Sequence, residues 1–94
     1  VKNGDYFFLQ VTGDSMIGAN IPSGSIVLVR RQSDVDDGQI AVVLIEGEAT
    51  IKRVYRQDGN LILQPENAKY RPQVITEGNV LILGRVIQVQ ISVA

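Results

Sequence analysis

The stretch QIAVVLIEGEATIKRVYR, residues 39–56, decides the fold. Its first seven residues, 39–45, are hydrophobic at almost every position, which predicts a strand that is buried on both faces. A tight Glu-Gly-Glu turn at 46–48 separates this run from a second one at 49–56. Two such runs joined by a short turn predict a β-hairpin.

Similar runs on both sides of this hairpin predict a mostly β chain. They are rich in Val, Ile and Leu, and Gly, Asp and Asn interrupt them at short intervals. Consecutive hairpins at this spacing predict a compact, strongly bent antiparallel sheet or a partly closed barrel. The other strands are expected at 6–11 (nearly all apolar and therefore well buried), 25–30, 61–64, 74–75 and 80–91, the last with a bulge or bend at Gly84.

Composition limits the kind of function. The 94 residues suffice for one domain with its own core, and 45% hydrophobic and 20% charged residues are an ordinary globular balance. The formal net charge is −1, whereas a domain that holds DNA by itself is normally basic. The chain has neither Cys nor His, which excludes thiolate chemistry and argues against a zinc site. No apolar stretch approaches the length of a membrane-spanning helix.

Ser15 is the candidate nucleophile and lies in the sequence GDSM, residues 13–16. A serine at such a place is ordinarily a turn or N-cap residue. Two features favour catalysis. Gly13 permits unusual backbone dihedrals just before the serine, and the backbone N–H groups of Asp14 and Ser15, which have no ladder partner in a loop, can form an oxyanion hole. Met16 is expected to be an apolar packing residue beside the nucleophile.

Lys52 is the candidate general base. A serine hydroxyl needs a base before it can attack, and histidine is absent. Lys52 shares one strand face with Thr50 and Val54, but both faces of this strand are mixed, so alternation leaves open which of them points inward. An inward Lys52 would have a lowered pKa, and its uncharged amine could accept the Ser15 proton. Arg53 cannot replace it, because a guanidinium group stays charged.

Several separate segments carry a resemblance to one family. They resemble the LexA-type repressors, a family of self-cleaving serine peptidases that includes phage repressors and UmuD-like mutagenesis proteins. The match runs in order along nearly the whole chain. The matching segments are GDSM at 13–16, IPSGSIVLV at 21–29, ATIKRV at 49–54, LQPEN at 63–67, YRP at 70–72 and LGRVI at 83–87.

The resemblance implies a serine endopeptidase with Ser15 as nucleophile and Lys52 as general base, and no cofactor. Residues 1–94 would be the single C-terminal peptidase and dimerisation domain of a cytoplasmic transcriptional repressor, a homodimer formed through the strand from about Leu83 to Ile91. In the family, an activated RecA filament promotes self-cleavage at an Ala-Gly or Cys-Gly bond during the DNA-damage (SOS) response.

This chain contains neither bond and no helix-turn-helix pattern. We therefore expect the cleavage segment and the DNA-binding domain, through which alone the protein would contact DNA, to lie upstream of Val1. Two alternatives stay open. One is a dimerisation module that keeps the fold without the activity. The other is an enzyme similar to type I signal peptidases, which also have Ser-Met and Lys-Arg steps, although the Pro-Thr that usually follows the Ser-Met step in that family is missing here and no membrane anchor is visible.

Overall fold

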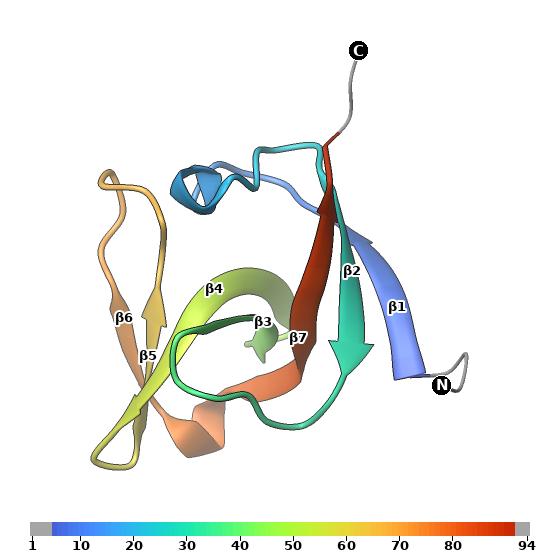
Figure 1. The fold of residues 1–94 in the computed structure, drawn as a ribbon. Helices are drawn as coiled ribbons and strands as arrows, with labels where there is room; N and C mark the ends of the chain where they lie inside the picture. The colour runs from blue at the N-terminus through green and yellow to red at the C-terminus, as the bar shows by residue number, and fades with distance from the viewer. Residues whose placement is uncertain (1–4, 92–94) are drawn as a thin grey trace.

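Seven strands of one antiparallel sheet make up most of the structure, a computed structural model that describes residues 5–91 (Figure 1). This confirms the mostly β prediction. Among the described residues, neither 3-10 helix, η2 (Ile17–Ala19) nor η3 (Glu77–Asn79), is long enough to cross a membrane. The strands are β1 (Tyr6–Gln10), β2 (Ile26–Arg31), β3 (Gln39–Ile45), β4 (Glu48–Gln57), β5 (Asn60–Gln64), β6 (Gln73–Thr76) and β7 (Leu81–Gln90).

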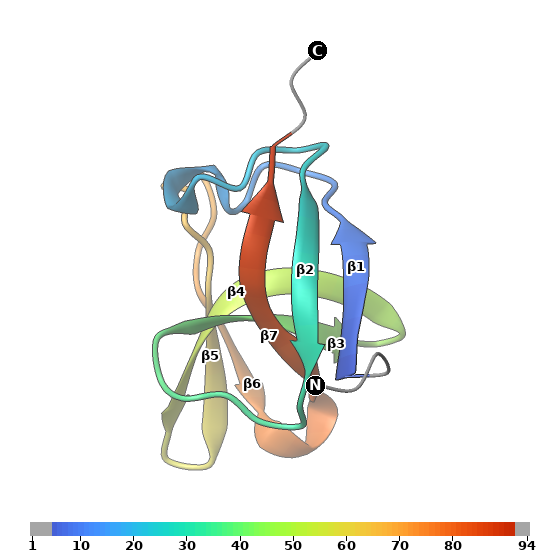
Figure 2. The same cartoon turned by 45° about the vertical axis from the view of Figure 1, so that its right-hand side comes forward.

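The strand order across the sheet is β1-β2-β7-β3-β4-β5-β6. The last strand of the chain, β7, therefore lies in the middle, and β1 and β6 are the edges of a sheet that does not close into a barrel. Figures 1 and 2 show β1, β2 and β7 side by side, with the long, curved β4 crossing behind them toward β5 and β6. The predicted strong bend is thus confirmed, and it wraps the sheet around its own core.

The strand β3 is buried on both faces, as its unbroken apolar sequence predicted. Val42 packs into one cluster with Val27 and Val29 from β2. Its neighbours Ala41 and Val43 point the other way, into a second cluster with residues of β4, β5 and β7. Each fully buried side chain of this kind contributes about 1.5–3 kcal/mol, so β3 joins the two halves of the core.

The strand β1 is less buried than its apolar sequence predicted. Phe8 is 63% exposed, because the bent sheet covers only one face of this edge strand. Phe8 lies opposite Leu28 of β2 on the outer face, while Val11, just beyond the strand, is buried in the core. The expectation that this strand is well buried is therefore wrong for its outer face.

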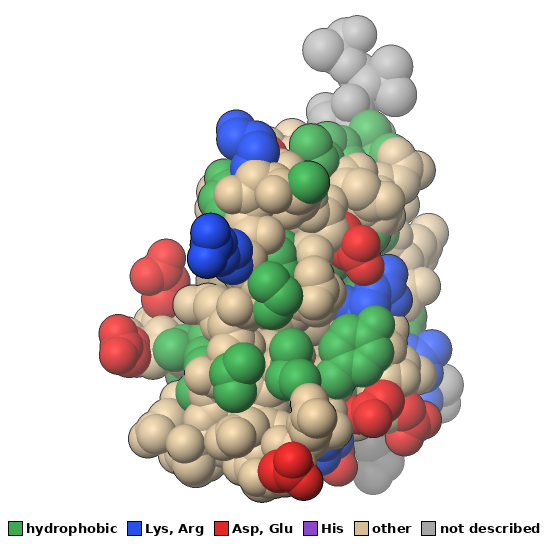
Figure 3. All heavy atoms as spheres, turned by 90° about the vertical axis from the view of Figure 1, so that its left-hand side faces the viewer, with side chains coloured by type: hydrophobic (Ala, Val, Ile, Leu, Met, Phe, Trp, Pro, Cys, Tyr) green, Lys and Arg blue, Asp and Glu red, His purple; other side chains and the backbone are tan. Residues whose placement is uncertain are grey.

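A second exposed apolar row crosses the other end of the sheet. Tyr55 of β4 pairs with Ile62 of β5, which pairs with Val74 of β6. Val74 is 66% exposed. Figure 3 shows hydrophobic side chains gathered on this side of the molecule, with acidic groups around them.

The predicted irregularity at Gly84 is confirmed as a β-bulge. Gly84 pairs with Val42 and Ile82 with Val43, so Leu83 is an extra residue in β7. A Cβ atom on Gly84 would lie 2.3 Å from the backbone oxygen of Arg30. Only glycine therefore allows β2 to approach this closely.

We expect Gly84→Ala to lower the free energy of unfolding by about 2 kcal/mol, because the added methyl group overpacks the contact with β2. Gly78→Ala is the matched control, since a Cβ there would meet no atom within 4 Å, and its effect should stay within about 0.5 kcal/mol. Urea unfolding of both variants measures the difference. Equal stabilities would show that the close approach at Gly84 is not a constraint.

Candidate active site

The structure brings Ser15 and Lys52 together. Ser15 lies on the loop between β1 and η2, and Lys52 lies in β4. Their side chains meet with Lys52 Nζ 3.0 Å from Ser15 Oγ, across 37 residues of sequence. The amine also lies 3.0 Å from Thr50 Oγ1 and 3.1 Å from the backbone oxygen of Ile51.

The surroundings of Lys52 favour its uncharged form. Its side chain is half-buried on the strand face that also carries the fully buried Val54. Removal from water disfavours the charged ammonium group, so burial lowers the pKa of Lys52 from its usual value. Once the amine is neutral, its lone pair can accept a proton from the Ser15 hydroxyl at hydrogen-bonding distance.

The loop that carries Ser15 is fixed by local backbone geometry. Gly13 adopts a φ of +86°, which a residue with a side chain rarely adopts, as the sequence predicted. Met16 is 2% exposed and packs into the core, which confirms its predicted role. The amide groups of Ala19 and Ile21 both donate to the Met16 carbonyl, at 3.0 and 3.2 Å. The nucleophile therefore sits on a loop with an anchored end.

The predicted oxyanion-hole donors have no competing acceptor. The next amides along the chain are engaged, because Ile17 donates to the Asp14 carbonyl at 3.4 Å and Gly18 to the Glu66 carbonyl at 2.6 Å. Within residues 5–91, no acceptor lies within hydrogen-bonding distance of the amides of Asp14 and Ser15. Such donors can bind a developing negative charge, although the role of these two remains a prediction.

Loop 65–70, between β5 and β6, grips the nucleophile loop. The Glu66 amide donates to the Ser15 carbonyl at 2.7 Å, and Asn67 Nδ2 donates to the Asp14 carbonyl at 2.8 Å. Sequence reasoning recognised this loop only by its resemblance to a family segment. Its contacts join residues more than 50 positions apart, and the pattern of a proline-bracketed loop does not reveal them.

Arg53 ties the same loop to the strand that carries Lys52. Its Nε lies 2.5 Å from Glu66 Oε1, and its Nη1 lies 2.5 Å from the Gly38 backbone oxygen. The ion pair bears out the expectation that this arginine is solvated or ion-paired. Lys52 and Ser15 thus have a second connection beside their own contact, through Arg53 and Glu66.

The Asp14 carboxylate serves as a tether. Tyr70 Oη donates to Asp14 Oδ1, and Lys69 Nζ lies 3.5 Å from Asp14 Oδ2. The hydrogen bond from Tyr70 holds the pKa of Asp14 below its usual value, and the same contact raises the pKa of Tyr70. Asp14 therefore stays ionised next to the nucleophile without taking the role of the base.

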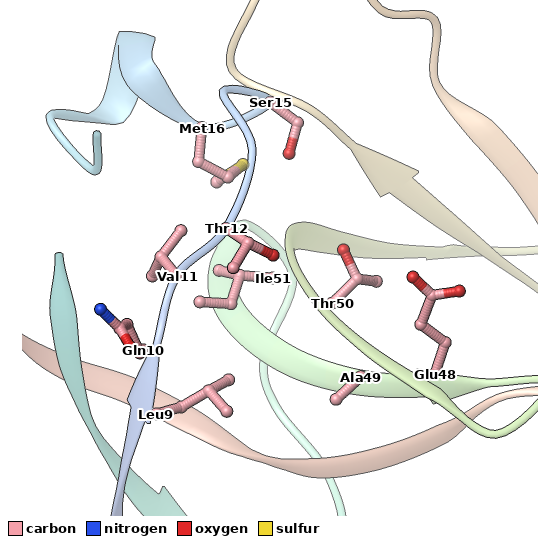
Figure 4. A pocket seen from close by; sticks show the side chains of 10 residues that line it. All are labelled: Leu9, Gln10, Val11, Thr12, Ser15, Met16, Glu48, Ala49, Thr50 and Ile51. Carbon is pink, nitrogen blue, oxygen red and sulfur yellow. The ribbon is translucent and has the colours of Figure 1, made fainter. Parts of the chain in front are cut away.

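Two hollows adjoin Ser15. One of about 130 Å³ lies between residues 9–12 and the start of β4, and Figure 4 shows Ser15 and Thr50 at its wall and Glu48 at its rim. The other, of about 360 Å³, has Lys52, Pro65, Tyr70 and Arg71 among its lining residues. A chain segment that crosses Ser15 would have room on both sides of the hydroxyl.

Comparison with known proteins agrees with this arrangement. Residues 1–87 match the family model described as peptidase S24-like. The chain is 47% identical to the LexA repressor of Geobacter sp. over 89 residues, 93% of this chain and 44% of that protein. It is 51% identical to the LexA repressor of Desulforamulus reducens over 84 residues, 89% of this chain and 38% of that protein. The chain therefore spans less than half the length of these curated relatives.

The lowered pKa of Lys52 predicts a specific dependence of stability on pH. Between the folded-state pKa and the unfolded value of about 10.4, the unfolded chain binds more protons, so the free energy of unfolding rises with pH in this window. Lys52→Met removes that rise. We therefore expect the variant to gain stability over the parent below the window, and the gain to shrink as pH increases.

Thermal unfolding at several pH values measures this difference. Lys69→Met, at a side chain that is 72% exposed, controls for the loss of a positive charge alone. A constant difference between Lys52→Met and the parent at every pH would contradict the lowered pKa.

Proposed function

Because the chain belongs to the peptidase S24-like family, we propose that it is the self-cleaving and dimerising domain of a LexA-like transcriptional repressor. The observation that carries the proposal is the 3.0 Å contact between Lys52 Nζ and Ser15 Oγ. A solvated strand lysine and a turn serine have no reason to meet in this way. A half-buried amine beside a hydroxyl has the arrangement of a base and its nucleophile.

The proposed reaction is peptide hydrolysis through an acyl-enzyme. Ser15 Oγ attacks the carbonyl carbon of the scissile bond while its proton passes to the neutral Lys52 amine. The backbone N–H groups of Asp14 and Ser15 donate to the resulting oxyanion. Collapse breaks the C–N bond, and the Lys52 ammonium gives its proton to the leaving amine. Water then releases Ser15 from the ester, with Lys52 again as the base.

The substrate we propose is a segment of the same protein upstream of Val1. It would cross Ser15 from one hollow to the other, with Thr50 Oγ1 helping to hold the Lys52 amine in place. Cleavage there would separate this domain from a DNA-binding half. Following the family resemblance, we propose that a RecA filament promotes the step in the cytoplasm during the DNA-damage response.

Dimerisation is proposed to use β7, for a reason that differs from the sequence argument. That argument treated the last strand as an end strand, whereas β7 lies between β2 and β3. However, its pairing with β3 stops at Arg85, while its pairing with β2 continues to Gln90. In the described part of the chain, the β3-facing edge of 86–90 has no strand partner. Antiparallel pairing with a second copy would cover that edge.

We expect self-cleavage of the protein with its upstream segment to accelerate about tenfold per pH unit while most Lys52 amines are protonated, and to level off above the pKa of Lys52. Lys52→Ala should lower the plateau by about 10²–10⁴-fold, and Ser15→Ala should abolish cleavage. Gel analysis of fragment formation over time, from about pH 6 to about pH 10, gives these rates.

Lys52→Arg is the matched control for charge and size, because a guanidinium group cannot act as a base in this range. It should cleave as slowly as Lys52→Ala. An intact linker at every pH would leave the domain as a dimerisation module without activity, and normal cleavage by Lys52→Ala would refute the role of Lys52.

Ile87→Glu should weaken the dimer at least about tenfold in Kd, or ~1.4 kcal/mol, because it places a charge next to the unpaired edge of β7, where Ile87 is 40% exposed. Val74→Glu changes an exposed apolar residue on β6 and should leave the dimer unchanged. Sedimentation equilibrium measures both. Equal weakening by the two variants would argue against β7 as the dimer strand.

A further inference from the structure

One peptide unit beside the nucleophile is held from its carbonyl side. Asn67 Nδ2 donates to the Asp14 oxygen at 2.8 Å. This carbonyl belongs to the same peptide unit as the Ser15 N–H group, a proposed oxyanion donor. In a trans peptide the C=O and N–H bonds point in opposite directions, and no cis peptide occurs among the described residues. The hydrogen bond from Asn67 therefore fixes the direction in which the Ser15 N–H points.

Asn67 itself is held in one orientation. Its Oδ1 accepts a hydrogen bond from the Lys69 amide at 3.0 Å, while its Nδ2 faces the Asp14 carbonyl. The acceptor is therefore opposite a donor and the donor opposite an acceptor, which defines the two ends of the amide group. The side chain is also half-buried.

The next peptide unit is held in the same way. The Glu66 amide donates to the Ser15 carbonyl at 2.7 Å, and the Glu66 carboxylate pairs with Arg53, the neighbour of Lys52 in β4. Two successive carbonyls of the nucleophile loop thus face loop 65–70, which is itself attached to the strand of the proposed base.

We propose that Asn67 is a positioning residue of the oxyanion hole, which rests on the function proposed above. Its side-chain amide aims the Ser15 N–H at the developing oxyanion. By donating to the carbonyl of the same peptide, it also polarises that peptide and strengthens its N–H as a donor. Asn67 touches neither the nucleophilic oxygen nor the base, so it should affect the rate of reaction and not the pKa of Lys52.

Phosphonylation of Ser15 by a fluorophosphonate probe tests this with residues 1–94 alone. In that reaction the Oγ–P bond forms, the P–F bond breaks, fluoride leaves, and Lys52 takes the hydroxyl proton, while the phosphoryl oxygen occupies the oxyanion site. The labelling rate is measured against pH for the parent, Asn67→Ala and Asn67→Asp. The aspartate variant keeps an acceptor for the Lys69 amide and loses only the donor.

We expect both variants to reach a plateau about 10²-fold below that of the parent, in line with the loss of one oxyanion donor. The uncharged Asn67→Ala should keep the pH midpoint of the parent, and it decides alone if Asn67→Asp does not fold. Asn79→Ala, in η3 at the opposite end of the molecule (Figure 1), is the matched control and should label like the parent.

An unchanged plateau, with or without a lower melting temperature, would overturn the proposal and leave Asn67 as a structural residue. A shifted midpoint in Asn67→Ala would also overturn it, because Asn67 would then act on Lys52. A parent that is not labelled at any pH would refute the proposed function, and the role of Asn67 with it.

Discussion

The structure depends on one contact, between the amine of Lys52 and the hydroxyl of Ser15. The amine must be removed from water far enough to lose its charge, yet it must keep polar neighbours, because a buried polar group without partners is costly. Thr50 and the Ile51 carbonyl supply those neighbours. The amine thus has a surrounding that satisfies its hydrogen bonds without any carboxylate to stabilise its positive charge.

A loop and a strand must stay in register for this contact to persist. β4 is held by β3 on one side and β5 on the other, so the position of Lys52 is set by the middle of the sheet. Ser15 has no such ladder. Its position comes from the buried Met16 below it and from the hydrogen bonds of loop 65–70 beside it. The ion pair between Arg53 and Glu66 joins these two systems.

The same bend that creates the core also creates the two features that distinguish the ends of the sheet. β3 leaves β7 after Arg85 to follow the curve of β4, and the second half of β7 keeps an edge without a strand partner in the described part of the chain. At β1 the bend covers only one face and leaves Phe8 in solvent. A flat sheet would have neither the open edge nor the site at the crossing of β4 with the nucleophile loop.

The sequence by itself determined the features that depend on local pattern. The unbroken apolar run of β3 predicted burial on both faces, Gly13 predicted the unusual backbone before Ser15, and the order of segments indicated the family. Only the tertiary structure decided that Lys52 points toward Ser15, that β7 lies inside the sheet, and that Asn67 and Glu66 hold the nucleophile loop. The physical reason is that alternation reports which residues share a face, whereas the side on which a neighbour lies is set by pairing between residues far apart in the chain.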